Sequence, residues 1–101
     1  MDVANFKASL QADSPLAGLS PPLAALWWLG KGDWNKAHEI AQEHDDQPSA
    51  WVHAHLHRVE GDLSNAGYWY RRAQRPEATA PLDVEWATIV DALLSGGPSS
   101  L

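Results

Sequence analysis

The sequence predicts an all-α protein, a compact array of about five helices built from two stacked helix-turn-helix hairpins. Three observations predict this fold class. Apolar residues recur at helical spacing in segments separated by Gly, Pro and Asp clusters. The motif Gly-Asp-x-x-x-Ala occurs twice, beginning at Gly32 and at Gly61. Hydrophobic residues make up 45% of the chain and charged residues 20%, a composition typical of globular domains.

The first three expected helices have recognisable boundaries. Residues 2–11 carry an apolar face at helical spacing. Ser20 is a suitable cap for the second helix, and the two prolines that follow suit a first helical turn. That helix is apolar all round, so we expect it at the centre of the core. Gly32 in the left-handed conformation and Asp33 as a cap would separate it from a helix over residues 34–44.

The second half of the chain is predicted to hold three more helices. One covers residues 50–60, with Ser49 as its cap, after the polar run Asp45-Asp46-Gln47-Pro48 ends the preceding helix. A second Gly-Asp turn leads to a helix over residues 63–74. The last helix covers residues 81–94 and has two acidic residues in its first turn, where the helix dipole favours them. The sequence therefore predicts one domain, with the tail noted below.

Composition, charge and the chain ends narrow the function classes. Residues 1–95 are predicted to form the single helical domain, and residues 96–101 a flexible tail. A net charge of −6 argues against a nucleic-acid or anionic-membrane partner, because phosphate groups attract positive surfaces. The absence of cysteine excludes disulfide and thiolate chemistry. With no signal-peptide pattern and no apolar run of about 18 residues, we expect a cytoplasmic protein.

Longer runs of residues carry a resemblance to known families. The paired Gly-Asp and Ala positions are similar to those of tetratricopeptide and Sel1-like repeats, although the spacing of 29 residues is shorter than the tetratricopeptide period of about 34. The runs LWWLGKGDW, AHEIAQ, WVHAHLHRVEGD and NAGYWYRRA resemble a family of small uncharacterised bacterial and fungal proteins over residues 19–76. The resemblance implies a helical-repeat architecture and no particular activity. In that pattern a tyrosine often stands at the position of His55, which disfavours His55 as a catalytic group.

The histidines form the first candidate site. His53 and His57 lie one helical turn apart, on the polar side of helix 50–60 opposite its apolar line, and this spacing lets two imidazoles bind one metal ion. Glu60, one turn further on, or His38 from the neighbouring hairpin could supply a third ligand. An open fourth position would then hold water and support hydrolysis. The alternative is a set of polar histidines that bond across helices or face solvent, since two histidines at this spacing are a weak motif.

Basic and aromatic residues form two further candidate sites. The basic residues could bind a carboxylate or phosphate, or could simply pair with nearby acids on the surface. These residues are Arg58, Arg71, Arg72 and Arg75. Most aromatic side chains are expected in the core. Trp28 and Tyr68 face away from the apolar lines of their helices, so they are candidates for a ligand groove or a dimer contact.

These observations lead to one expected function and two alternatives. We expect a non-enzymatic interaction module that binds a protein segment or a small anion in a groove beside helix 50–60. The groove candidates are His38, His53, His57, Tyr68, Arg71 and Trp28. The first alternative is a metal-dependent hydrolase that holds zinc or another divalent metal at His53 and His57, and no other cofactor is expected. The second is a homodimer joined through exposed tryptophans.

Overall fold

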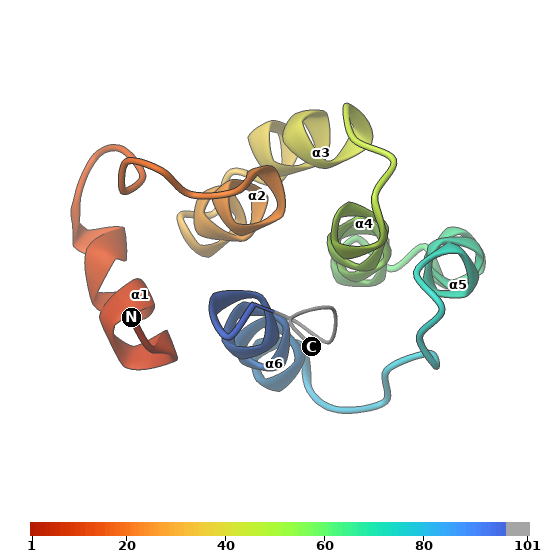
Figure 1. Ribbon diagram of the computed structural model, residues 1–101. Coiled ribbons are helices and arrows are strands. Elements are labelled where there is room, and N and C mark those ends of the chain that lie inside the picture. Colours follow the sequence, from red (N-terminus) through yellow and green to blue (C-terminus); the bar gives the residue numbers. More distant parts are fainter. Residues whose placement is uncertain (97–101) are drawn as a thin grey trace.

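The fold is entirely helical in the part of the chain that the structure describes, residues 1–96. The structure is a computed structural model. It contains six α-helices, a short 3-10 helix and no strand within those residues (Figure 1). The elements are α1 (Val3–Ala8), η1 (Ser9–Gln11), α2 (Pro21–Gly30), α3 (Trp34–Gln42), α4 (Gln47–Val59), α5 (Leu63–Arg72) and α6 (Leu82–Leu94). The all-α prediction is confirmed, and the predicted tail beyond Gly96 lies outside the described residues.

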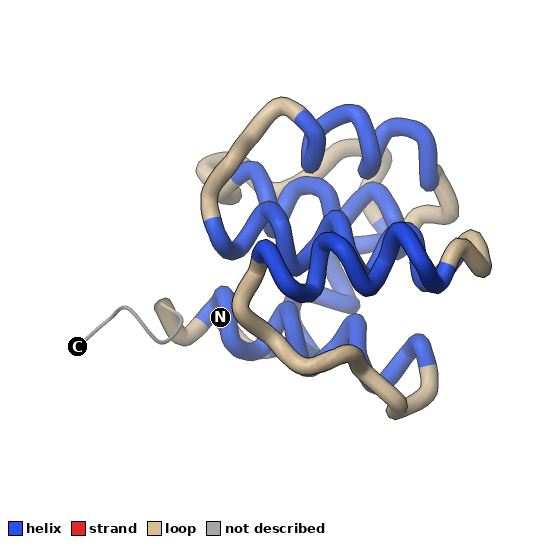
Figure 2. The backbone as a smooth tube through the Cα atoms, turned by 90° about the vertical axis from the view of Figure 1, so that its right-hand side faces the viewer, coloured by secondary structure: helices blue, strands red, loops and turns tan. Residues whose placement is uncertain are grey.

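The helices pair into two hairpins, α2 with α3 and α4 with α5. α4 is the central helix, because it also packs against α2, α3 and α6. α6 lies along the inner side of α2 and α4, and α1 packs against α6 at the edge of the array (Figure 1). Seen from the side in Figure 2, the helices lie in successive layers with loops at their ends. None of the helices in residues 1–96 combines the length and the apolar character needed to cross a membrane.

The two Gly-Asp turns have the same backbone geometry. Gly32 and Gly61 adopt positive φ angles of 89° and 86°, the left-handed conformation that glycine takes without a steric penalty. The amides of Asp33 and Asp62 each donate to the carbonyl five residues earlier, at 2.9 Å in both turns. Each Asp carboxylate then accepts from the amide three residues later and so caps the next helix. The repeat in the sequence is therefore a repeat in structure.

The buried core runs through both hairpins and out to α6. Ala37 and Ala66, the alanines of the repeated motif, are buried where the helices of each hairpin approach closely. Trp86 fastens α6 to this core, since its indole Nε1 donates to the carbonyl of Leu26 over 2.9 Å. Phe6 of α1 packs against the same indole with ring centroids 5.7 Å apart. α6 thus covers one side of α4 and closes the core there.

Two predicted helix starts need correction. α4 begins at Gln47 and not at residue 50, because Asp46 caps it by accepting from the Ser49 amide at 2.8 Å. Pro48 does not end the preceding helix but occupies the first turn of α4, where its missing amide hydrogen is not needed. Ser49 is consequently buried inside the helix. Ser20 precedes α2 as expected, yet its side chain makes no capping hydrogen bond.

Candidate metal centre

Three histidines from two helices meet between the hairpins. α4 supplies His53 and His57, one helical turn apart, and α3 supplies His38. Nε2 of His38 lies 3.0 Å from Nε2 of His53. One nitrogen from each of the three rings lies within 4.8 Å of the other two. The structure therefore brings together the histidine pair predicted from spacing and one of its two suggested partners, in a group called the three-histidine cluster below.

The burial of this cluster differs from the sequence interpretation. His53 and His57 were assigned to a polar line opposite the apolar side of their helix, but they are only 5% and 6% exposed. The reason is tertiary: α3 and α5 cover the side of α4 that carries them, while α6 covers another side. His38 is half-buried and forms the more accessible part of the cluster. The histidines line a closed junction between helices and not an open groove.

Two tryptophans hold the imidazole rings from outside. Trp34, the first residue of α3, stacks on His38 with ring centroids 4.8 Å apart and an angle of 9° between the planes. Trp69 of α5 stacks on His53 at 3.9 Å and 12°. Trp34 is itself fixed, because its Nε1 donates to the carbonyl of Leu56 over 2.7 Å. Stacked aromatic walls restrict ring rotation, so the nitrogens are held in their positions.

The electrostatics keep at least two of the rings neutral at pH 7. Burial, together with the neighbouring His38 and His57, lowers the pKa of His53 to about 4. Burial and His57 also lower the pKa of His38, against a smaller opposing effect of Glu60. A neutral imidazole carries a lone pair on one nitrogen, which is the form that binds metal ions.

Glu60 lies beside the cluster as a partner of His57. Glu60 follows the last residue of α4, and its Oε1 is 2.5 Å from Nδ1 of His57 in the last turn of that helix. This contact leaves Nε2 of His57 for the centre of the cluster. A carboxylate that accepts from the outer nitrogen is the usual support for a metal-binding histidine. Glu60 also lies near Asp62, but Asp62 already caps α5.

The other predicted groove residues do not join the histidines. Tyr68 is exposed on α5, and its hydroxyl accepts from Arg72 over 3.1 Å. Its ring contacts the edge of Trp69, so it reaches His53 only through that indole. Arg71 is exposed beside Gly67 and Glu77. The six residues expected in one groove are therefore divided between the cluster and the molecular surface.

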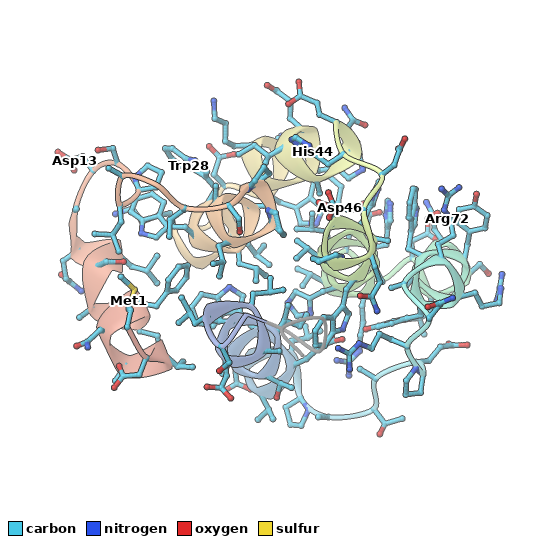
Figure 3. All side chains as sticks on the ribbon, viewed as in Figure 1. Met1, Asp13, Trp28, His44, Asp46 and Arg72 are labelled. Atoms are coloured by element: carbon cyan, nitrogen blue, oxygen red, sulfur yellow. The ribbon has the colours of Figure 1, made fainter. Side chains whose placement is uncertain are left out.

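Trp28 lies in a separate part of the molecule. It packs edge-on against Trp27 with centroids 5.1 Å apart, and the Lys36 ammonium lies 5.8 Å from its ring. Figure 3 shows Trp28 beside α2 and Arg72 on the outer side of α5, at opposite ends of the array. A single ligand of modest size would not contact both residues.

A second polar cluster was missed in the sequence. The Glu85 carboxylate on α6 is buried and accepts from His55 Nδ1 at 2.6 Å, from Arg58 at 3.0 Å and from the Tyr70 hydroxyl. Burial opposes ionisation of Glu85, but the hydrogen bonds from His55 and Tyr70 and the nearby charges outweigh it and lower its pKa. Burial and the contact with Glu85 raise the pKa of Tyr70. Arg58 also donates to the Ala80 carbonyl.

These contacts correct two expectations. One interpretation of the sequence paired Arg58 with nearby acids on the surface, with Glu60, Asp62 and the 43–46 stretch as partners. Glu85 was expected only as one of the two acids that the helix dipole favours in the first turn of the last helix. The two residues instead pair with each other across 27 positions of sequence. No local pattern signals such a pairing, because it depends on how α6 folds back onto α4.

Comparison with known proteins leaves the geometry as the only guide to function. No protein-family model, curated protein or solved structure matches this chain. The resemblance seen in the sequence stays an expectation. The chemical interpretation rests on the three-histidine cluster and its surroundings.

Proposed function

We propose that this protein is a non-enzymatic helical-repeat module that binds a divalent transition metal, with zinc as the first candidate, through His38, His53 and His57. The convergence of one nitrogen from each ring within 4.8 Å carries the proposal. Zinc–imidazole bonds are about 2.0–2.1 Å long, so nitrogens around one tetrahedral ion lie roughly 3.3 Å apart. The 3.0 Å separation in the His38–His53 pair needs only a few tenths of an ångström of adjustment.

Two further features support metal binding over a simple hydrogen-bonded pair. The pKa of His53 is lowered to about 4, so the ring is neutral at pH 7 and at pH values well below it. A metal ion therefore need not displace a proton from this ring. The carboxylate of Glu60 holds the outer nitrogen of His57, which orients the inner one. A hydrogen bond between His38 and His53 involves only two of the three rings. It does not explain why His57 also lies close to them.

A bound ion would join the two hairpins. His38 belongs to the first hairpin, whereas His53 and His57 belong to the second. A ligand that binds only the folded state stabilises it by about 2.7 kcal/mol at a free concentration one hundred times its Kd. The module would then respond to metal availability through the rigidity of its central joint.

The test begins with elemental analysis of untagged protein, followed by zinc titration in a calorimeter. We expect one ion per chain, and His38→Ala should weaken binding by at least about a hundredfold, because even outer-sphere partners of a metal site contribute 10- to 100-fold. His38 is the substitution of choice, since it is the least buried of the three ligands. His44→Ala is the matched control, a half-buried histidine outside the cluster. Equal affinities in the two variants, or no heat in the wild type, would contradict the proposal.

Hydrolysis is the second candidate function. Three protein ligands leave the fourth position of a tetrahedral zinc ion for water, as in catalytic zinc sites. The half-buried position of His38 favours this candidate, because solvent reaches the cluster on that side. Zinc-loaded protein would be assayed with p-nitrophenyl acetate and p-nitrophenyl phosphate across pH 6–9. Turnover that requires zinc and disappears in His38→Ala would support a hydrolase, and its absence would support the non-enzymatic module.

The expected protein or anion partner is best placed on the outer side of α5. α3 and α5 cover the side of α4 that carries His53 and His57, so the groove expected beside residues 50–60 is not open to a partner. On α5, Leu63 and Tyr68 are exposed, and the Arg72 guanidinium lies 5.9 Å from the Tyr68 ring and 5.2 Å from the Trp69 ring. Analytical ultracentrifugation of the wild type and Tyr68→Glu tests the homodimer. A dimer lost in the variant would support an interface on this side, and a dimer retained would place it elsewhere.

A further inference from the structure

Trp51 of α4 and Arg75, which follows α5, form a stacked pair that lines two clefts. The Arg75 guanidinium carbon lies over the Trp51 ring, 3.9 Å from its centroid. The larger cleft has a volume of about 480 Å³, within the range of small-molecule sites. The stacked pair, the first residues of α2 and α4 and the end of α6 line it. We call this feature the Arg75 cleft.

The turn after α5 brings Arg75 to this position. Its amide donates to the Tyr70 carbonyl five residues earlier at 3.0 Å, as the amides of Asp33 and Asp62 do in the Gly-Asp turns. Gln74 stands where those turns have glycine, and it adopts the same left-handed conformation with a φ of 58°. The third turn therefore repeats the geometry of the first two. It has a basic residue in place of the capping acid, at a point where no helix begins.

The Arg75 guanidinium has no partner for its charge among residues 1–96. The ion pairs within that range are formed by Arg58, His55 and His57 with two glutamates. Nε of Arg75 is buried and makes no hydrogen bond to a described residue. An arginine side chain stays charged in proteins, and a buried donor without an acceptor is costly. An anion that accepts from the guanidinium would supply both the counter-charge and the acceptor.

The two clefts beside Arg75 differ in charge. The second cleft, of about 300 Å³, is also lined by Glu77 and by the buried Glu85. These two acids would repel an anion there. Among the described residues that line the Arg75 cleft, Asp46 is the one acid, and its carboxylate already caps α4 by accepting from the Ser49 amide at 2.8 Å. An anion is therefore favoured in the Arg75 cleft.

The surroundings favour a ligand with a single negative charge. The guanidinium supplies one positive charge, and the exposed Asp46 opposes a second negative charge on the ligand. The starts of α2 and α4 contribute the positive ends of two helix dipoles, and the end of α6 contributes one negative end. Pro21, Pro48 and Leu93 give the cleft apolar walls. The cleft therefore suits a monoanion with an apolar body.

We propose that the Arg75 cleft binds a small monocarboxylate whose apolar body is about the size of a benzene ring, with the carboxylate accepting from the Arg75 guanidinium. The planar carboxylate matches the planar fork of the arginine, and the stack on Trp51 holds that fork in place. Burial of the apolar body against the proline walls adds affinity. The site shares no residue with the three-histidine cluster, and neither Tyr68 nor Arg72 lines it.

The test is a titration of ¹⁵N-labelled protein with benzoate, followed by NMR. We expect saturable shifts of the Arg75 Nε–H signal and of the Trp51 indole N–H signal. Benzamide has nearly the same shape without the charge, and it should bind at least about tenfold more weakly, the effect of a hydrogen bond between charged groups. Inorganic phosphate carries more negative charge and should also bind more weakly. Equal affinity for benzamide, phosphate binding as tight as benzoate, or no saturable shift would overturn the proposal.

Two arginine variants test the role of the guanidinium. Arg75→Gln should weaken benzoate binding by at least about tenfold, because the charged donor is lost. Arg72→Gln removes the same charge from the exposed side of α5 and should retain the affinity of the wild type. Equal losses in the two variants would mean that benzoate responds only to net charge, and the assigned site would be wrong.

Two exposed residues separate the two clefts. Ser20 lines only the Arg75 cleft, and Thr79 lines only the second cleft. Ser20→Trp should block benzoate, whereas Thr79→Trp should retain it, with both variants folded by circular dichroism. The Ser20 side chain makes no capping hydrogen bond that this change would remove. The opposite result would place the anion in the second cleft and overturn the assignment. His38→Ala should retain benzoate binding, which separates this site from the metal proposal.

Discussion

The two sides of α4 carry polar clusters with opposite electrostatic character. His53 and His57 face α3 and α5, where they meet another histidine and two tryptophans. His55, between them in sequence, faces α6, where it meets the Glu85 carboxylate and lies beside Arg58. One cluster gathers lone pairs and has a single acid at its edge. The other pairs a carboxylate with three donors.

The difference separates the proposed metal site from a network of hydrogen bonds within the protein. A buried carboxylate with a guanidinium, an imidazole and a phenol has its hydrogen bonds satisfied within the protein. Each neutral imidazole carries one N–H and one lone pair, and we propose that a cation takes the lone pairs that the three converging rings turn toward one another. Similar residues on one helix thus serve different purposes because of what the neighbouring helices supply. Three predictions test this contrast.

The largest expected effect is on the structural network. Glu85→Ala leaves Arg58 without its buried counter-charge, and removal of one partner of a buried pair typically costs about 3–5 kcal/mol. We therefore expect the free energy of unfolding to fall by about that amount in urea titrations followed by tryptophan fluorescence. Asp83→Ala, an exposed acid in the same helical turn, should change it by less than about 0.5 kcal/mol. Similar small losses in both variants would show that the pair does not fasten α6.

The second expected effect is the pH dependence caused by the three-histidine cluster. The pKa of His53 is lowered from 6.5 to about 4 in the folded state, so the unfolded state binds more protons between those values. Stability should therefore be complete above pH 6.5 and fall as the pH drops toward 4. Each proton of difference contributes about 1.4 kcal/mol per pH unit. Urea unfolding at pH 7, 6 and 5 measures the slope.

His53→Gln provides the control for this slope, because glutamine does not titrate. The variant should lose the His53 part of the pH dependence, whereas His44→Ala should retain it. Glu85 acts at lower pH, since the lowered pKa of its carboxyl means that its contribution is lost only as the pH falls through that value. A slope unchanged in His53→Gln would mean that the cluster is not the cause.

The sequence predicted features that depend on residues close together in the chain. The Gly-Asp turns were predicted because a left-handed glycine followed by a capping Asp is a local device, and Gly32 and Gly61 both adopt it. The helical segments were predicted because apolar spacing is also local. Helix starts were less accurate where two signals competed, as at Pro48, which suits a helix start as well as a helix end.

The sequence did not predict how α4 is covered. His53 and His57 lie on a side of α4 that the sequence pattern indicates is polar. That side is buried only because α3 and α5 pack against it. The contact of Glu85 with His55 joins residues 30 positions apart, so no helical period contains it. The histidine spacing within α4 was recognised, but the choice of His38 and not Glu60 as the third member required the tertiary structure.

The smallest expected effect is at the edge of the three-histidine cluster. Glu60→Gln keeps the size of the side chain but removes the charge that holds Nδ1 of His57 at 2.5 Å. We expect zinc affinity to fall by about tenfold, the lower end of the range for carboxylates that support metal-binding histidines. Unfolding without metal should change by less than 1 kcal/mol, since Glu60 is exposed and ion pairs at the surface contribute little.

Glu39→Gln is the matched control for this prediction, an exposed acid on α3 that does not contact the cluster. Its zinc affinity should equal that of the wild type, which accounts for the general loss of one negative charge. If Glu60→Gln and Glu39→Gln weaken zinc equally, the carboxylate acts only through net charge. If Glu60→Gln alone weakens zinc while stability without metal is preserved, the acid orients His57 for the ion, and the two sides of α4 differ in purpose as well as in charge.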